Sequence, residues 1–340
     1  MSLQNKNCVA YLTSLSLLFS YAEFFLPRFA FFKLGLSNIV ILSSLNLNFS
    51  SFLILCFLKS LTSSFLSGTL FSPFFLISLG QSLSSGLLMF ALNLIFKNRK
   101  FISLYGISVL GSSFSALVQI FLAALYLGSG TFKLLGYLSL FSVFTGIFTA
   151  YFCVKLNLES YVENKKNLSL PEDFKFDFKS KNLATNSKSE TKKSKTKSII
   201  LISLILIFSV AIFMIQNIYV LLGCFLVSLI LQIIFGRKIL ILPHIFTWIF
   251  VIISCILVPS GKNLFMIFKF PVTQGALFNG IKKSLQLSAT MALSQCAAKI
   301  NFTSNSLLSL TFFYFKNFCE TFKNEKGNVW KKLKLTLEKI

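Results

Sequence analysis

Residues 50–96, SSFLILCFLKSLTSSFLSGTLFSPFFLISLGQSLSSGLLMFALNLIF, contain two long apolar runs, 50–67 and 73–96, with a short Gly-Thr turn between them. Each run approaches the roughly 20 residues that an α-helix needs to cross about 30 Å of hydrocarbon. The strands of a membrane β-barrel would instead alternate apolar and polar residues over segments of about 10 residues. The stretch therefore predicts two consecutive membrane-spanning helices.

The composition of the whole chain agrees with this reading. Of its 340 residues, 55% are hydrophobic and only 13% are charged, which is too apolar for a surface exposed to water. The formal net charge is +23, but the lysines lie mostly at the ends of apolar runs and in one central tract. That distribution is typical of the positive-inside rule and not of a nucleic-acid-binding surface. We expect an all-α polytopic protein whose environment is the lipid bilayer, with no nucleic-acid partner.

Hydropathy predicts about ten spans, six in the first half and four in the second. The predicted spans are 8–26, 36–49, 50–67, 73–96, 101–127, 134–154, 198–216, 218–235, 239–258 and 275–299. With a cytoplasmic N-terminus, Lys97, Lys100 and Lys155 all lie inside. The sequence therefore predicts a multi-pass protein of the cytoplasmic membrane with both termini in the cytoplasm.

A charged tract divides the chain. Residues 155–197 carry eleven lysines against six acidic residues and few apolar ones after Phe178. Such a segment buries too little surface to fold, which predicts a flexible cytoplasmic linker. Contact of KKSKTK (192–197) with lipid headgroups is the alternative. The predicted domains are 1–155, a linker at 156–197, and 198–340.

The sequence lacks the residue patterns of several enzyme classes. PSGKN (259–263) lacks the first glycine and the final Ser or Thr of a Walker A loop, and there is no DDxxD-like acidic cluster for Mg²⁺ and a diphosphate. The single histidine, His244, stands alone within an apolar run. We expect no catalytic residues, no metal and no cofactor in this chain. Any ATP hydrolysis would come from another subunit.

Polar residues inside predicted spans are the better candidates for a site, because burying them in a bilayer is costly. They are Glu23, Lys59, Gln81 and Gln119. Glu23 and Lys59 could form a pair or face a substrate cavity. Snorkelling and structural hydrogen bonding are the alternative explanation.

A motif in the first half provides a family resemblance. FFKLGLSNIVIL (31–42) resembles the P-G-x-K-L-G-L-A-N-I-V-T-L motif of the Gx transporter family, formerly labelled heptaprenyl diphosphate synthase component I. Residues 57–89 and 106–128 resemble later spans of that family, with Lys59 at an arginine position. The resemblance implies a six-helix fold similar to the substrate-binding S component of energy-coupling factor (ECF) transporters.

The resemblance also suggests where a substrate would bind. Gly35 permits a tight backbone path, so Lys33 and Asn38 could point from a re-entrant segment into a cavity. An anchoring role for Lys33 at the membrane interface is the alternative. The candidate substrate-binding residues are Lys33, Gly35, Asn38, Lys59, Gln81 and Gln119.

The second half carries a weaker resemblance. FPVTQGALFNGIKKSLQLSATMALS (270–294) resembles a span of the ECF T component, which couples S components to ATPases through cytoplasmic helices. The tail is amphipathic, with apolar residues at spacings of three and four that we interpret as a coupling face. These residues are Leu307, Leu310, Tyr314 and Phe318. A helix lying on the membrane surface is the alternative.

The function that these features favour is a non-enzymatic membrane subunit of an ECF-type importer. It would bind a small vitamin- or precursor-like molecule and couple to separate ATPase subunits. One alternative is a non-catalytic membrane partner of a polyprenyl (heptaprenyl) diphosphate synthase. A scaffold that binds no small molecule is the other.

Overall fold

The computed structural model describes residues 3–23, 35–96, 102–164, 188–236, 239, 241–267, 270–297 and 306–339. Its first half contains α1 (Leu3–Glu23), α2 (Asn38–Ser43), α3 (Phe49–Ser67), α4 (Pro73–Phe96), α5 (Leu104–Leu127), the 3-10 helix η1 (Ser129–Leu134), α6 (Leu135–Lys155) and α7 (Leu158–Asn164). Its second half contains α9 (Lys188–Met214), α10 (Ile218–Ile234), α11 (Ile241–Ile256), β1 (Asn263–Ile267), β2 (Phe270–Thr273), α12 (Gln274–Ala297), α13 (Leu307–Asn324) and α14 (Val329–Lys339). The predicted helical architecture is confirmed, with one addition: β1 and β2 pair as an antiparallel hairpin before α12.

Local sequence explains where several helices begin and end. Gly68 adopts φ +68° and ends α3 in the left-handed conformation that glycine tolerates best. Pro73 begins α4. The first residue of a helix donates no helical hydrogen bond, so proline, which lacks a backbone N–H, fits there. The Asn217 side chain accepts a hydrogen bond from the backbone N–H of Tyr219 at 3.0 Å and so caps α10. The short turns that separate the spans therefore follow from ordinary capping chemistry.

Four helical segments among the described residues are long and apolar enough to cross a membrane. They are Phe49–Ser67, Pro73–Phe96, Leu104–Leu127 and Ser129–Lys155. Three shorter apolar helices lie in the second half, at Ile200–Met214, Ile218–Ile234 and His244–Ile256. The chain is thus a membrane protein by the length and composition of its helices, but the predicted count of about ten spans is not confirmed.

The predicted span at 36–49 does not form. Only Asn38–Ser43 is helical, and turns follow until Asn48, the N-cap of α3. Six helical residues rise about 9 Å, far less than the hydrocarbon thickness. Asn46 and Asn48 lie at the end of the apolar stretch, where polar side chains favour a turn over a continued helix.

The predicted flexible linker is partly ordered. Leu158–Asn164 form α7, whose Leu158 and Val162 are buried, and Lys188 already belongs to α9. Residues 165–187 lie outside the described part of the chain. Two apolar residues four positions apart are enough to hold α7 against the first half, even though its composition is mostly polar.

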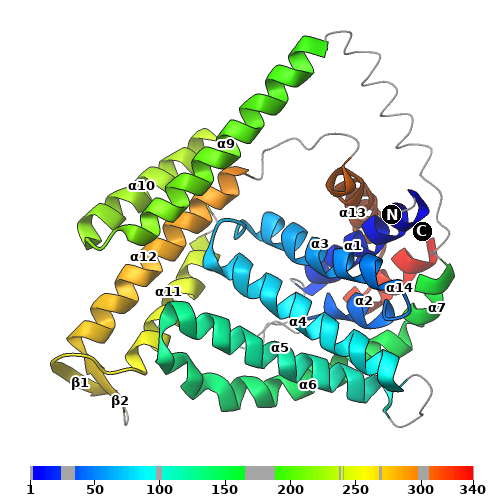
Figure 1. Cartoon of the computed structure of the whole chain (residues 1–340), viewed down its shortest axis with the longest axis horizontal. Helices are drawn as coiled ribbons and strands as arrows, with labels where there is room; N and C mark the ends of the chain where they lie inside the picture. Colours follow the sequence, from blue (N-terminus) through cyan, green and yellow to red (C-terminus); the bar gives the residue numbers. More distant parts are fainter. Residues whose placement is uncertain are drawn as a thin grey trace.

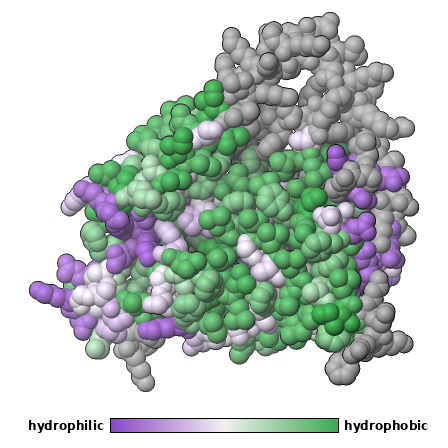
Figure 2. Space-filling model, in the orientation of Figure 1, coloured by the Kyte–Doolittle hydropathy of each residue, from purple (hydrophilic) through white to green (hydrophobic). Residues whose placement is uncertain are grey.

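The helices form two groups that run in different directions. In Figure 1, α3 to α6 lie beside one another, whereas α9, α10 and α12 run across their ends. Figure 2 shows a broad hydrophobic face, with hydrophilic residues gathered at its left and right edges. Apolar side chains that are well exposed on this fold include Leu125, Phe144 and Ile207. Lipid is the environment that suits such a face.

The two groups meet where α5 ends. Lys133 of η1 donates a hydrogen bond to the carbonyl of Leu257 at 2.6 Å. Lys283 of α12 donates to the carbonyl of Leu127, the last residue of α5, at 3.0 Å. A lysine at this position also favourably meets the negative end of the α5 dipole. These contacts hold the second half against one end of the first.

Candidate functional site

The candidate site begins with a buried lysine. Lys59 lies past the middle of α3 and is only 8% exposed. It donates a hydrogen bond to the side-chain oxygen of Asn38, the first residue of α2. A charged amine inside a membrane domain needs a polar partner, and the amide oxygen of Asn38 supplies one.

A second contact fixes the neighbouring backbone. The backbone N–H of Gly35 donates to a carboxylate oxygen of Glu23, at the end of α1, over 3.0 Å. Gly35 has φ +69°, and a Cβ there would lie 3.3 Å from the Asn38 amide nitrogen. The turn that presents Asn38 to Lys59 therefore favours glycine through its positive φ, and a Cβ would also push on the Asn38 amide.

Together these contacts join three helices at one point. The end of α1, the start of α2 and the middle of α3 contribute a carboxylate, an amide and an ammonium group, and Glu23 attracts the charge of Lys59. The structure therefore brings together Gly35, Asn38 and Lys59, three of the candidate substrate-binding residues. Lys33 lies outside the described residues.

Gln81 and Gln119 form a separate pair. The amide nitrogen of Gln81 in α4 donates to the amide oxygen of Gln119 in α5 at 3.3 Å. The next residue, Ser82, donates to the carbonyl of Cys56 at 3.2 Å, one turn before Lys59 on α3. The glutamine pair is thus tied to the same helix as Lys59 through Ser82.

The predicted coupling face is covered by the chain itself. Leu310, Tyr314 and Phe318 are buried, and Leu307 packs against the same core. The ring of Tyr11 in α1 lies 5.4 Å from that of Tyr314 and 5.1 Å from that of Phe318, both edge to face. This face of α13 therefore packs on α1, and a partner could reach it only if α13 moved away.

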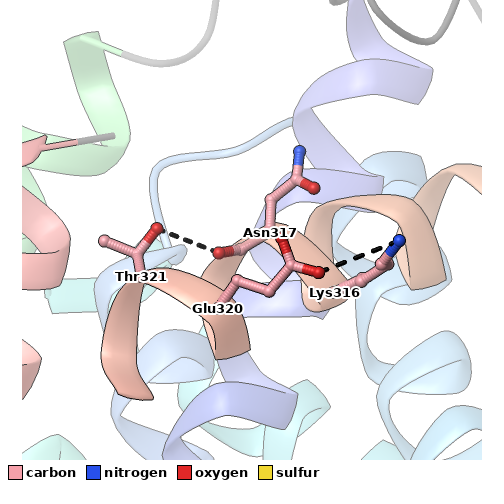
Figure 3. A network of polar contacts seen from close by, with 4 residues as sticks. All are labelled: Lys316, Asn317, Glu320 and Thr321. Atoms are coloured by element: carbon pink, nitrogen blue, oxygen red, sulfur yellow. Dashed lines mark hydrogen bonds and ion pairs between the residues drawn. The ribbon is translucent and has the colours of Figure 1, made fainter. Parts of the chain in front are cut away.

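The opposite side of α13 is open. Figure 3 shows Lys316 beside Glu320, with their charged groups 3.8 Å apart and both side chains well exposed. In the same view the Thr321 hydroxyl donates to the carbonyl of Asn317 at 3.0 Å. An exposed pair of this kind contributes little to stability, so this side is free to face solvent or a partner.

A polar junction around α12 was not singled out from the sequence. The amide nitrogen of Gln286 lies 3.3–3.4 Å from the carbonyls of Ile212, Phe213 and Ile215, at the end of α9. Its amide oxygen accepts from the Tyr126 hydroxyl of α5 at 3.3 Å. A glutamine inside a predicted span was the available signal, since such residues are usually buried among partners.

His244 packs against an aromatic neighbour of α10. It is buried, and its ring lies 5.9 Å from that of Phe225 at a steep angle. Among the described residues, no group of three His, Cys, Asp or Glu side chains is placed to hold a metal ion.

Each half of the chain matches a known protein family. Residues 195–300 match a domain of unknown function, DUF8519. No curated protein matches the chain. No solved structure matches it either. Residues 12–156, from α1 to the end of α6, match the family described as heptaprenyl diphosphate synthase component I, which confirms the family resemblance of the first half.

Proposed function

We propose that the chain is the membrane subunit of an ECF-type importer, with both termini in the cytoplasm. The observation that carries the proposal is the cluster that buried Lys59 forms with Asn38 and Glu23, which are both half-buried. Polar groups placed together within a membrane domain commonly mark a substrate pathway. Two of the three N–H donors of Lys59 are not used by Asn38, so a polar ligand that entered here would find a directed cation.

The position of α13 supports the coupling part of the proposal. Its apolar face lies on α1, the helix that ends at Glu23. The carbonyl of Thr311 also accepts a hydrogen bond from Ser14 at 2.6 Å. A shift of α13 caused by separate ATPase subunits would therefore act directly on the helix that leads to the candidate site.

Ligand binding tests the site. Small molecules retained by the purified protein would be identified by mass spectrometry, and their affinity measured for Asn38→Ala and Lys33→Gln. Asn38 positions the Lys59 ammonium group, so Asn38→Ala should misplace that cation. Loss of the charge-assisted hydrogen bond between Lys59 and the ligand, worth roughly 1.5–3 kcal/mol, predicts binding about tenfold to a hundredfold weaker. Asn317→Ala, which removes an exposed amide from α13, is the matched control. If Asn38→Ala binds as tightly as this control, the site lies elsewhere, and Gln81 and Gln119 become the next candidates.

A second candidate function follows from the description of the matching family. A synthase component of this kind would be a non-catalytic membrane partner of a polyprenyl diphosphate synthase. Copurification separates the two proposals. Nucleotide-binding ATPase subunits that copurify with the tagged chain support the importer, whereas a soluble prenyltransferase supports the alternative.

A further inference from the structure

An aromatic groove lies on the membrane-facing surface of α5 and α6. It encloses about 360 Å³, and almost all of its lining is apolar. Its lining includes Tyr105, Phe141, Phe144, Thr145, Phe148 and Tyr151. Both helices are candidate membrane spans, so the groove faces the environment in which lipid chains lie.

The groove has the length of one leaflet. From Phe141 to Tyr151 the α6 backbone rises by ten residues, or about 15 Å. This is half of the roughly 30 Å hydrocarbon core. An extended lipid chain that begins at one membrane surface would therefore run along the whole groove.

The two ends of the groove differ in character. Phe141 and Phe144 lie at one end, while Tyr105 and Tyr151 lie at the other. Trp330 of α14 packs near the second end, with its ring 6.0 Å from that of Phe148. Tyr and Trp are enriched where a membrane meets water, so the tyrosine end marks the interface.

A cation stands at the interfacial end. The ammonium group of Lys155 lies 3.3 Å from the Tyr151 hydroxyl and 5.3 Å from the centre of its ring. Lys155 is exposed, and it ends α6. The nearest acidic residues along the chain, Glu159 and Glu163, belong to α7. An apolar groove with an exposed cation at its mouth is complementary to a lipid that has an anionic headgroup.

We propose that this groove binds one acyl chain of an anionic phospholipid, whose phosphate group pairs with Lys155. The aromatic rings provide the contact with the chain, and Lys155 provides the preference for negative charge. This site is separate from the Lys59 cluster and holds whether or not the chain is an importer.

Native mass spectrometry of the full-length protein tests the preference. The protein would be titrated with phosphatidylglycerol and with phosphatidylcholine of identical acyl chains. A basic residue near an anionic headgroup contributes roughly fivefold in affinity, so phosphatidylglycerol should bind about fivefold more tightly. Lys155→Gln should remove that difference, whereas Lys316→Gln, an exposed lysine on α13, should retain it. Equal binding of the two lipids by the unmodified protein, or equal effects of the two substitutions, would overturn the proposal.

A second pair of variants tests the groove itself. Thr145→Phe fills the groove and should weaken binding of both lipids about tenfold, whereas Leu140→Phe, on the exposed face of α6 outside the groove, should not. Fluorescence gives an independent readout, because Trp330 and Trp248 are the two tryptophans of the chain. In a Trp248→Phe background, brominated phosphatidylglycerol should quench Trp330 more strongly than brominated phosphatidylcholine. Equal quenching would show that lipid contacts this surface without selection, and would also overturn the proposal.

Discussion

The two halves of the molecule are each built around one central helix, α1 in the first and α12 in the second. Every residue from 7 to 19 and every residue from 284 to 296 is buried. Neither helix is among the candidate spans, although they contain 21 and 24 residues. Both are rich in Ser, Thr, Asn and Gln, which lower hydropathy but are tolerated where protein replaces lipid around the helix.

The two helices use their polar residues differently. In α1, the Thr13 hydroxyl donates to the Val9 carbonyl of its own helix at 2.7 Å, and α1 meets α13 mainly through aromatic rings. In α12, polar side chains reach other helices: Ser288 accepts from the Trp248 indole at 2.7 Å, and Gln295 accepts from Gln232 at 2.5 Å. Aromatic packing therefore dominates the contact of α1 with α13, beside the hydrogen bond from Ser14 to the Thr311 carbonyl, whereas side-chain hydrogen bonds link α12 to its neighbours.

The largest loss of stability is expected at the aromatic contact between α13 and α1. Phe318 is 1% exposed, and its ring lies 5.1 Å from that of Tyr11. Phe318→Ala removes a large buried side chain and leaves a cavity, which predicts a loss of roughly 3–5 kcal/mol in the free energy of unfolding. Thermal unfolding in detergent measures it as a lower Tm.

Lys316→Ala is the control on the same helix. It removes a well-exposed ion pair with Glu320 and should change the free energy of unfolding by less than about 1 kcal/mol. A Tm for Phe318→Ala that matches this control would mean that α13 does not rest on α1 in solution.

A smaller effect is expected at the polar junction of α12. Gln286→Leu removes bonds to α9 and to the Tyr126 hydroxyl. Hydrogen bonds between membrane helices contribute roughly 0.6–1.7 kcal/mol, because the separated helices also find partners. We expect a loss of about 1–2 kcal/mol by the same measurement.

A double-mutant cycle with Tyr126→Phe separates the bond from the change in shape. If Tyr126 and Gln286 interact as the geometry shows, the double variant should lose less than the sum of the single variants. Strict additivity would show that the halves are held together by other contacts, such as that of Lys283 with Leu127.

The difference between the central helices also explains what the sequence could predict. Hydropathy identified α3 to α6 well, because these helices expose apolar side chains. It also indicated the Lys59 position, since a lysine within an apolar run is conspicuous. The motif at 31–42 marked Gly35 and Asn38 as candidate site residues, but only the fold shows that Asn38 accepts a hydrogen bond from that lysine.

Other features depend on contacts between distant segments, which a one-dimensional pattern does not contain. The spacing of Leu310, Tyr314 and Phe318 predicts an apolar face, but only the fold shows that α1 covers it. Similarly, the residues of α2 are apolar, so hydropathy predicts that they belong to a membrane span. In the fold they are buried by other parts of the protein and not by lipid. Apolarity alone does not distinguish these two environments.

The smallest change in stability is expected in α7, at the edge of the core around α1. Glu159 lies beside Tyr161, whose hydroxyl is hydrogen-bonded to that of Tyr11. Partial burial and the nearby Glu163 raise the pKa of Glu159 in the folded protein. A raised carboxyl pKa means that the folded state favours the protonated form. The contribution of Glu159 to the free energy of unfolding is therefore fully present below the ordinary pKa of a glutamate. It is lost as pH rises through the pKa that Glu159 has in the folded protein.

Glu159→Gln removes that titration and should leave the stability of the variant less sensitive to pH. We expect the variant and the unmodified protein to have similar Tm values near pH 4, with the variant becoming relatively more stable toward pH 7. Parallel Tm curves for Glu159→Gln and the unmodified protein across this range would show that folding does not raise the pKa of Glu159.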